Sequence, residues 1–320
     1  MPVRRINRIV SLSVIPLMLL TIAVFSRFAK DPTPAEPPTE GTLVVANLRR
    51  ETVTFVDLAT ANRRELALPG PPHELLVEGG RLYVTLGRAN LLAEVDIGAR
   101  AILRTISLEG EPHGLATLGG NLYVTLDKGN AVAVIDRATM TELRRLPTGD
   151  TPHVIAATGA AIVVTDSRDN ALRQLEPGAA TVPTGAQPEG LAIVGGVAVT
   201  ADANSGTVTF AKVPGLADVR TLRIGALPVR VIPLDGARAL VSLQGDGTVA
   251  VVDVAKGEVA KRLRVAARPD GTCVSPDGGY LAVASNGEGT LDLFETGKWH
   301  RAPSLAFEPG LGACAWLPVR

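Results

Sequence analysis

Aromatic residues and net charge are both scarce in this sequence. Phe, Trp and Tyr make up 3% of its 320 residues, and the formal net charge at pH 7 is zero. The sequence therefore has few aromatic side chains on which bases could stack, and no net positive charge to attract phosphates. We do not expect a protein that binds nucleic acid.

Catalytic motifs and cysteines are also few. The GxSxG, HExxH and CxxC patterns do not occur, and no GxGxxG joins a strand to a helix. The first of the two cysteines is Cys273, so no cysteine near the N-terminus could carry a lipid anchor. Because no nucleophile–base pair is recognisable, the sequence favours a binding protein, and an enzyme stays open as the alternative.

Only one long apolar run is present, and it lies near the N-terminus. The uncharged segment from Ile9 to Phe25 follows Arg4, Arg5 and Arg8. Its length lies between that of a signal-peptide core and that of a membrane span, so residues 1–30 are a cleaved signal or, as we prefer, an uncleaved anchor. The basic flank predicts that the N-terminus is inside and that the rest is extracytoplasmic, in the periplasm or at the cell surface.

Residues 31–41 follow as a proline-rich linker. The sequence DPTPAEPPTE (31–40) contains four prolines. Such a composition favours an extended polyproline II conformation. We expect a semi-rigid spacer between the N-terminal segment and the domain that follows.

Residues 42–320 contain a repeat. Two series of positions recur in phase at intervals of about 40 residues. The small residues that end LYVT-like runs are Ala46, Thr85, Thr125, Thr165, Thr200, Ser242 and Ala284. The prolines that precede GLA-like runs are Pro72, Pro112, Pro152, Pro188, Pro228, Pro269 and Pro309. Both series have seven members, which indicates seven structural units.

Each unit contains four short strand-like runs. In the third unit these are residues 114–119, 121–126, 131–136 and 141–147. Four strands per repeat without a helix are typical of a propeller blade. The sequence therefore predicts an all-β fold, a seven-bladed β-propeller of four-stranded antiparallel blades.

The two ends of the repeat array predict how the ring closes. The array begins at residues 42–47 with a second-strand sequence and finishes at residues 311–319 with a first-strand sequence. We expect the C-terminal strand to pair with Leu43–Ala46 and to complete the first blade. This closure removes exposed strand edges and favours a monomeric propeller.

The repeat resembles the YVTN-type, WD40-like seven-bladed propellers. The matching runs are LYVTL (82–86 and 122–126), NAVAVID (130–136) and VSPDGGYLAVAS (274–285). Propellers of this kind occur as binding modules, as parts of periplasmic redox enzymes and beside lactone hydrolases. The resemblance therefore implies a fold but does not choose among these functions.

Strand direction predicts which residues share one end of the propeller. The position after each repeat proline and the loop between the second and third strands open on the same mouth. The positions after the prolines hold His73, His113, His153, Glu189, Val229, Asp270 and Gly310. Blades 2 to 4 combine the histidines with basic loops that carry Arg88, Lys128 and Arg168, whereas blades 5 to 7 are mostly acidic.

Three interpretations of His73, His113 and His153 are open. Imidazoles from neighbouring blades could ligate Zn, Cu or haem iron, with Glu189 or Asp270 completing the set. Together with the basic loops they could instead bind a small polar or anionic ligand, or a protein partner. Alternatively, histidine is a turn residue that tandem duplication copied, in which case it binds nothing.

Two further residue sets have structural interpretations. Aspartates that end third strands are expected to cap the following turns: Asp57, Asp96, Asp136 and Asp253. Cys273 and Cys314 lie in first strands of adjacent blades but differ by one residue in their distance from the repeat proline. Because a one-residue shift reverses the side of the sheet, we expect two buried thiols rather than a disulfide.

These observations together predict an extracytoplasmic, membrane-tethered propeller that acts as a binding or scaffold module. Its ligand or partner surface is the channel mouth that carries the histidines and basic loops. The alternative is an enzyme that uses the same mouth, either a metal- or haem-dependent oxidoreductase or a lactonase-like hydrolase.

Overall fold

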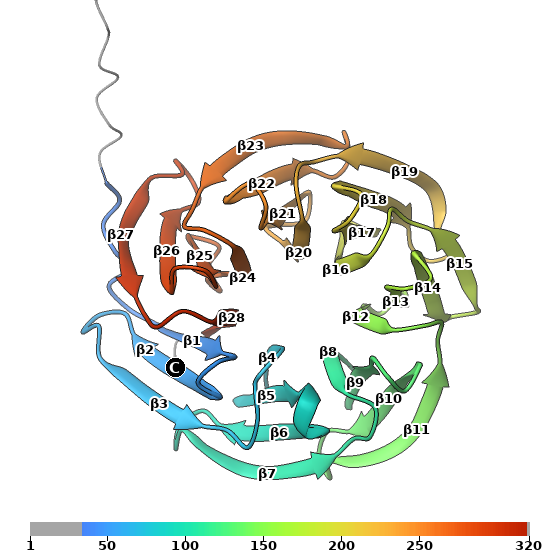
Figure 1. Ribbon diagram of the computed structural model, residues 1–320, viewed down its shortest axis with the longest axis horizontal. Helices are drawn as coiled ribbons and strands as arrows, with labels where there is room; N and C mark the ends of the chain where they lie inside the picture. Colours follow the sequence, from blue (N-terminus) through green and yellow to red (C-terminus); the bar gives the residue numbers. More distant parts are fainter. Residues whose placement is uncertain (1–33, 319–320) are drawn as a thin grey trace, which may run out of the picture. The chain divides into compact units, whose positions relative to one another are not determined.

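The computed structural model describes residues 34–318 and contains seven four-stranded antiparallel sheets around a central axis (Figure 1). The predicted seven-bladed β-propeller is confirmed. From the axis outward, blade 1 consists of β28 (Leu311–Leu317), β1 (Thr42–Asn47), β2 (Thr52–Asp57) and β3 (Arg63–Ala67). The C-terminal strand pairs with β1, as predicted, and closes the ring.

The other blades each use four consecutive strands. Blade 2 has β4 (Leu75–Glu78), β5 (Arg81–Leu86), the short helix η1 (Gly87–Ala89), β6 (Leu91–Asp96) and β7 (Ala101–Ser107). Blade 3 has β8 (Pro112–Leu118), β9 (Asn121–Leu126), β10 (Ala131–Asp136) and β11 (Thr141–Pro147). Blade 4 has β12 (Pro152–Ala157), β13 (Ile162–Asp166), β14 (Ala171–Glu176) and β15 (Ala180–Pro183).

Blades 5 to 7 repeat this arrangement. Blade 5 has β16 (Pro188–Val194), β17 (Val197–Asp202), β18 (Thr207–Lys212) and β19 (Ala217–Arg223). Blade 6 has β20 (Pro228–Pro233), β21 (Arg238–Leu243), β22 (Thr248–Asp253) and β23 (Glu258–Arg264). Blade 7 has β24 (Pro269–Val274), β25 (Tyr280–Ser285), β26 (Thr290–Glu295) and β27 (Arg301–Ala306).

The core consists of apolar layers between neighbouring blades. Along β1, Leu43 and Val45 pack toward blade 7, whereas Val44 and Ala46 pack toward blade 2. This alternation follows from the two-residue period of a strand. Because β1 is buried on both faces, it contains a continuous apolar run, whereas the equally buried β2 alternates threonines with apolar residues.

Aspartates at the ends of third strands cap turns, as predicted. Oδ1 of Asp57 accepts a hydrogen bond from the backbone N–H of Thr60 at 2.9 Å. Asp136 makes the equivalent contact to Thr139 at 2.8 Å. Asp96 and Asp253 act in the same way. These carboxylates hold the turns at the end of the propeller opposite the mouth.

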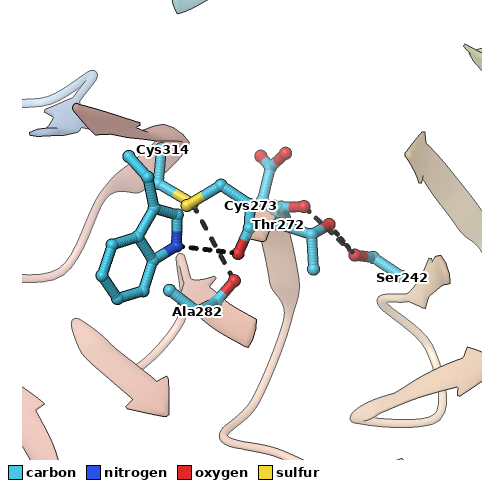
Figure 2. The surroundings of a disulfide bond; sticks show 7 residues. Ser242, Thr272, Cys273, Ala282 and Cys314 are labelled. Carbon is cyan, nitrogen blue, oxygen red and sulfur yellow. Dashed lines mark hydrogen bonds between the residues drawn. A yellow bond between two sulfur atoms is a disulfide. The ribbon is translucent and has the colours of Figure 1, made fainter. Parts of the chain in front are cut away.

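Cys273 and Cys314 form a disulfide, so the expectation of two free thiols is wrong (Figure 2). Their Cα atoms are 5.8 Å apart. Each blade turns one side of its sheet toward the preceding blade and the other side toward the following blade. Side chains at equivalent positions of two neighbouring blades therefore point in the same direction around the ring. A one-residue offset therefore turns the two side chains toward each other. Cys273 and Cys314 meet in the layer between blades 7 and 1.

The disulfide joins blade 7 to the strand that closes the ring. Nearby, the indole Nε1 of Trp316 donates a hydrogen bond to the carbonyl oxygen of Cys273 at 3.1 Å. β28 is thus held by its pairing with β1, by a covalent bond and by this hydrogen bond.

The end of the proline-rich linker contacts blade 7 at the propeller face opposite the mouth. The backbone N–H of Ala35 donates to the carbonyl of Arg301 at 3.0 Å, and the Tyr280 hydroxyl donates to the carbonyl of Glu36 at 3.2 Å. Pro38 is buried in this contact region. No helix in residues 34–318 is long and apolar enough to cross a membrane. The predicted N-terminal anchor or signal, residues 1–30, lies outside the described residues.

Candidate functional site at the channel mouth

A bulge positions the residues that follow the repeat prolines. The register between first and second strands shifts by one residue just after Pro112, and similar shifts follow Pro152 and Pro269. A bulge bends a strand and redirects its side chains. The first strands therefore present side chains at the channel mouth.

In blades 2, 3 and 6, the hydroxyl at the end of the LYVT-like run ties the blade to its neighbour at this level. Oγ1 of Thr125 accepts from the N–H of Gly114 in its own blade and donates to the carbonyl of His153 in the next, both at 2.7 Å. Thr85 donates in the same way to the carbonyl of His113 at 2.7 Å. The small polar residue found in the sequence repeat thus fixes the backbone that carries the histidines.

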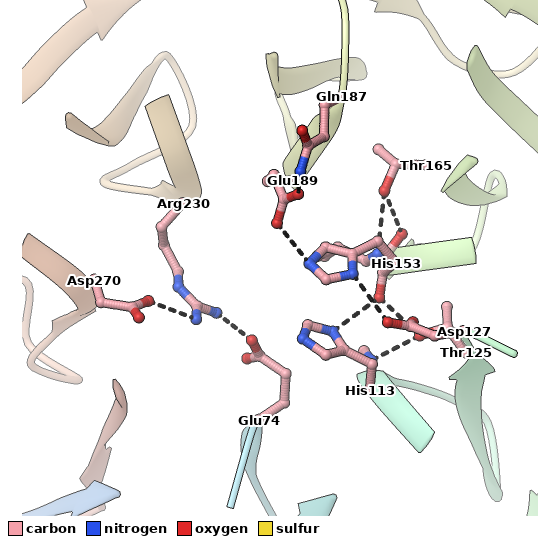
Figure 3. Close-up of polar contacts among 12 residues, drawn as sticks. Glu74, His113, Thr125, Asp127, His153, Thr165, Gln187, Glu189, Arg230 and Asp270 are labelled. Carbon is pink, nitrogen blue, oxygen red and sulfur yellow. Dashed lines mark hydrogen bonds and ion pairs between the residues drawn. The ribbon is translucent and has the colours of Figure 1, made fainter. Parts of the chain in front are cut away.

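The three predicted histidines lie side by side, as their blades do. The rings of His113 and His153 stack with their centroids 3.9 Å apart. The ring of His73 is tilted against that of His113, at a centroid distance of 5.0 Å. Nδ1 of His113 is 3.1 Å from the carbonyl oxygen of His153, which assigns the proton to Nδ1 and leaves Nε2 as an acceptor (Figure 3).

His153 lies between two carboxylates. Its Nε2 is 2.9 Å from Glu189, and its Nδ1 is 3.3 Å from Asp127 in the β9–β10 loop (Figure 3). Burial opposes protonation of this ring, but the hydrogen bonds and charges of Asp127 and Glu189 outweigh it and raise the pKa of His153 to about 10. His153 is therefore an imidazolium at neutral pH.

The other two histidines are neutral. Burial lowers the pKa of His73 and, with the nearby charges of His153 and Arg230, lowers the pKa of His113 well below its ordinary value. Burial favours a higher pKa for Glu189, but the contact with His153 outweighs it, and the pKa of Glu189 is lowered. The stack thus combines one charged imidazole with two neutral ones.

Arg230 spans the channel from blade 6. Its guanidinium forms ion pairs with Glu74 of blade 2 at 2.5 Å and with Asp270 of blade 7 at 3.2 Å (Figure 3). The three side chains are 15% to 23% exposed. Burial opposes the charge of Arg230, but the two carboxylates outweigh it and raise its pKa above the usual range. Asp270, predicted as a site residue, is thus one partner of a partly buried ion network.

These side chains enclose a cavity of about 290 Å³ at the mouth. Its charged and imidazole lining comprises His73, Glu74, His113, His153, Glu189, Arg230 and Asp270. The carboxylates of this lining belong to Glu74, Glu189 and Asp270, and Asp127 lies behind His153. They face only two cations, Arg230 and the imidazolium of His153. The net charge of these cavity-lining groups is therefore negative.

The basic loop residues lie farther out. Arg88, Lys128 and Arg168 are all exposed and do not line this cavity. Arg88 borders a separate depression together with His73. In blade 5, Asp202 at the end of β17 is buried and accepts hydrogen bonds from Thr207 and Thr209.

Three residues of the site were not predicted. Glu74 and Arg230 lie two positions after a repeat proline, one position beyond those that hold the histidines. Asp127 lies in the same loop as Lys128, where only the basic residue was considered. A comparison of both positions after the prolines could have identified Glu74 and Arg230, but not that they pair.

Comparisons with known proteins place the chain in a class. No family model and no curated protein sequence matches it. Solved structures resemble it over most of its length, and its own seven four-stranded sheets define the class as seven-bladed β-propellers.

Three of these structures illustrate the range. A protein described as functionally unknown, from Desulfotomaculum acetoxidans, is 12% identical, with a TM-score of 0.72 over 87% of this chain and 99% of its own. AztD from Citrobacter koseri is 13% identical, with a TM-score of 0.66 over 86% and 97%. Virginiamycin B lyase from Staphylococcus aureus is 15% identical, with a TM-score of 0.66 over 78% and 92%. At these identities the likeness shows the fold alone.

Proposed function

We propose that this protein is an extracytoplasmic, membrane-tethered binding module whose channel mouth takes a small polar ligand. The observation that carries the proposal is the axial cavity of about 290 Å³, lined by partly buried charged groups and neutral imidazoles from several blades. Its size is at the lower end of the range for small-molecule sites. The YVTN-type repeat is consistent with this role, because binding modules are among the proteins that carry it.

The extracytoplasmic placement has two supports. A disulfide between Cys273 and Cys314 is typical of an oxidising compartment. The basic flank and apolar run of residues 4–25 fit an N-terminal anchor or signal. Since residues 34–41 reach the propeller at the end opposite the mouth, a tether there leaves the mouth free.

The charge of the mouth favours a cationic ligand over an anionic one. Glu74, Glu189 and Asp270 line the cavity, and Arg230 is already paired with two of them. An anion would approach this carboxylate excess at a cost, whereas a cation would relieve it. Lys128 and Arg168 are exposed to solvent, where their attraction for an anion is screened.

Calorimetric titration of the full-length protein tests this proposal. Alkylammonium and guanidinium compounds are compared with carboxylates and phosphate of similar size. Cations should bind, Glu189→Gln should weaken binding by about tenfold or more, and Lys128→Ala, as a matched control on the same mouth, should not. Binding of anions alone, weakened by Lys128→Ala and Arg168→Ala, would instead place the ligand on the outer loops.

The enzymatic alternative has one supporting observation, the close grouping of His113, Asp127 and His153, which could hold a metal ion. An oxidoreductase or lactonase-like hydrolase would need such a group beside a substrate cavity. Turnover of model lactones or of a redox dye by the metal-supplemented protein, abolished by Asp127→Asn, would favour this alternative.

A further inference from the structure

We propose that the mouth holds a divalent transition-metal ion, with His113, Asp127 and His153 as its protein ligands. This inference rests on the proposed function of the axial cavity as a binding site and specifies the cation. It also defines a ligand set different from the three histidines that the sequence suggested, because it includes a carboxylate and omits His73.

The three ligands come from two adjacent blades. One potential ligand atom from each of His113, Asp127 and His153 lies within 4.8 Å of the others. Ligand atoms about 2 Å from an ion lie at most about 4 Å from one another. Binding therefore draws the side chains together by roughly 1 Å and displaces the Nδ1 proton of the His153 imidazolium to solvent. The stacked rings then turn so that their in-plane lone pairs converge.

A second observation points to an ion at Asp127. Within residues 34–318, Oδ1 of Asp127 is buried and has no hydrogen-bond partner. A buried carboxylate oxygen without a partner is costly, and a bound ion satisfies such an atom. Oδ2 of the same residue already faces Nδ1 of His153 at 3.3 Å. The carboxylate is thus placed to bind a cation beside that nitrogen.

Glu189 supports the site as a positioning residue. It faces Nε2 of His153 at 2.9 Å, on the ring edge remote from Asp127, and Gln187 donates a hydrogen bond to its other oxygen at 2.5 Å (Figure 3). Histidines that bind a metal through one nitrogen commonly donate the other N–H to a carboxylate, which fixes the tautomer. His153 with Asp127 on one side and Glu189 on the other has this arrangement.

The ligand types indicate which ions fit. Two imidazoles and a carboxylate suit Zn²⁺, Co²⁺, Ni²⁺ or Cu²⁺, whereas Mg²⁺ and Ca²⁺ prefer oxygen ligands. Three protein ligands leave a coordination position free for a water or another ligand. His113 and His153 also line the axial cavity, so an ion there is reachable from the mouth.

His73 provides a matched control. It belongs to the same stack and lines the same cavity, but it is not part of the group formed by His113, Asp127 and His153. Replacing it removes an imidazole from the mouth without removing a proposed ligand.

The test is titration of the full-length protein with Zn²⁺ and with Co²⁺, whose visible spectrum reports its coordination. The wild type is compared with four variants: His113→Ala, Asp127→Asn, Glu189→Gln and His73→Ala. Loss of a residue that only orients a ligand weakens metal binding by about 10- to 100-fold. Glu189→Gln should fall in that range, and His113→Ala and Asp127→Asn should lose at least as much and change the Co²⁺ spectrum. His73→Ala should bind one ion per chain like the wild type. Thermal unfolding of each variant verifies that it is folded.

Two results would overturn the inference: a wild type that binds neither ion, or a folded Asp127→Asn variant with the affinity of the wild type. A loss in His73→Ala equal to that in His113→Ala would assign the ion to the histidines alone. None of these outcomes decides the proposed function, because the titration with organic cations detects ligand binding independently of a metal.

Discussion

Arg230 and Glu74 are 156 positions apart in the sequence, yet they form an ion pair across the central channel. The pair connects blade 6 to blade 2, and Asp270 of blade 7 shares the guanidinium. The channel is thus bridged by one cation and two carboxylates just where the axial cavity lies. This network links blades 2, 6 and 7 across the channel and contributes to the charge of the mouth.

Replacement of Arg230 should destabilise the propeller. In Arg230→Met, Glu74 and Asp270 remain largely buried without their cation, and breaking such a pair costs up to about 3 kcal/mol. Urea unfolding followed by circular dichroism measures the loss. Arg238→Met is the control, because Arg238 pairs with Asp235 at an exposed position, where about 0.5 kcal/mol is expected. Equal losses in the two variants would contradict a stabilising role for the channel network.

The disulfide should contribute substantially to stability. Reduction, or the Cys273→Ala/Cys314→Ala double variant, opens a covalent loop that spans 41 positions. Chain entropy predicts a loss of about 4 kcal/mol for a loop of this length. Thiol titration of the untreated protein in denaturant, without reductant, should detect no free thiol. Two free thiols per chain would show that the bond does not form, and an unchanged unfolding midpoint after reduction would contradict its stabilising role.

Removal of the C-terminal strand should prevent ring closure. A chain that ends at Pro309 lacks β28, so β1 loses its inner partner and Cys273 loses Cys314. An exposed strand edge and apolar layer then favour aggregation. We expect an insoluble or protease-sensitive product. A chain that ends at Pro318 keeps β28 and serves as the control. Protease resistance of the shorter chain would contradict closure by this strand.

The imidazolium of His153 should make stability depend on pH in the alkaline range. Its pKa is about 10 in the fold and about 6.5 in the unfolded chain. Since the folded-state value is the higher one, this contribution is present in full below pH 6.5 and is lost as the pH rises toward 10. Urea unfolding at pH 6.5, 8 and 9.5 should show this decline in the wild type.

The variant His153→Gln should lack this part of the decline. His300→Gln replaces a histidine in the β26–β27 turn at the opposite end and should keep it. Any decline in stability that the wild type and both variants share comes from other titratable groups. An identical pH dependence in the wild type and His153→Gln would show that Asp127 and Glu189 do not hold His153 charged.

Much of the site was predictable in outline. The positions after the repeat prolines place His73, His113 and His153 on adjacent blades at one mouth, and the structure places them in contact. The basic loops were assigned to the same mouth, but their long side chains extend into solvent. Side-chain direction depends on neighbouring charges, which a strand pattern does not encode. The strand pattern alone therefore did not show which charged groups line the cavity.

The sequence by itself determined the number of blades, the four strands of each and the strand that closes the ring. These follow from local rules, the two-residue alternation of strands and the turn residues between them, which every repeat displays. Only the tertiary structure decided that Arg230 reaches Glu74, that His153 lies between Asp127 and Glu189, and that Cys273 bonds to Cys314. These contacts depend on how separate blades face one another across the channel and between sheets, and that geometry exists only once the ring is closed.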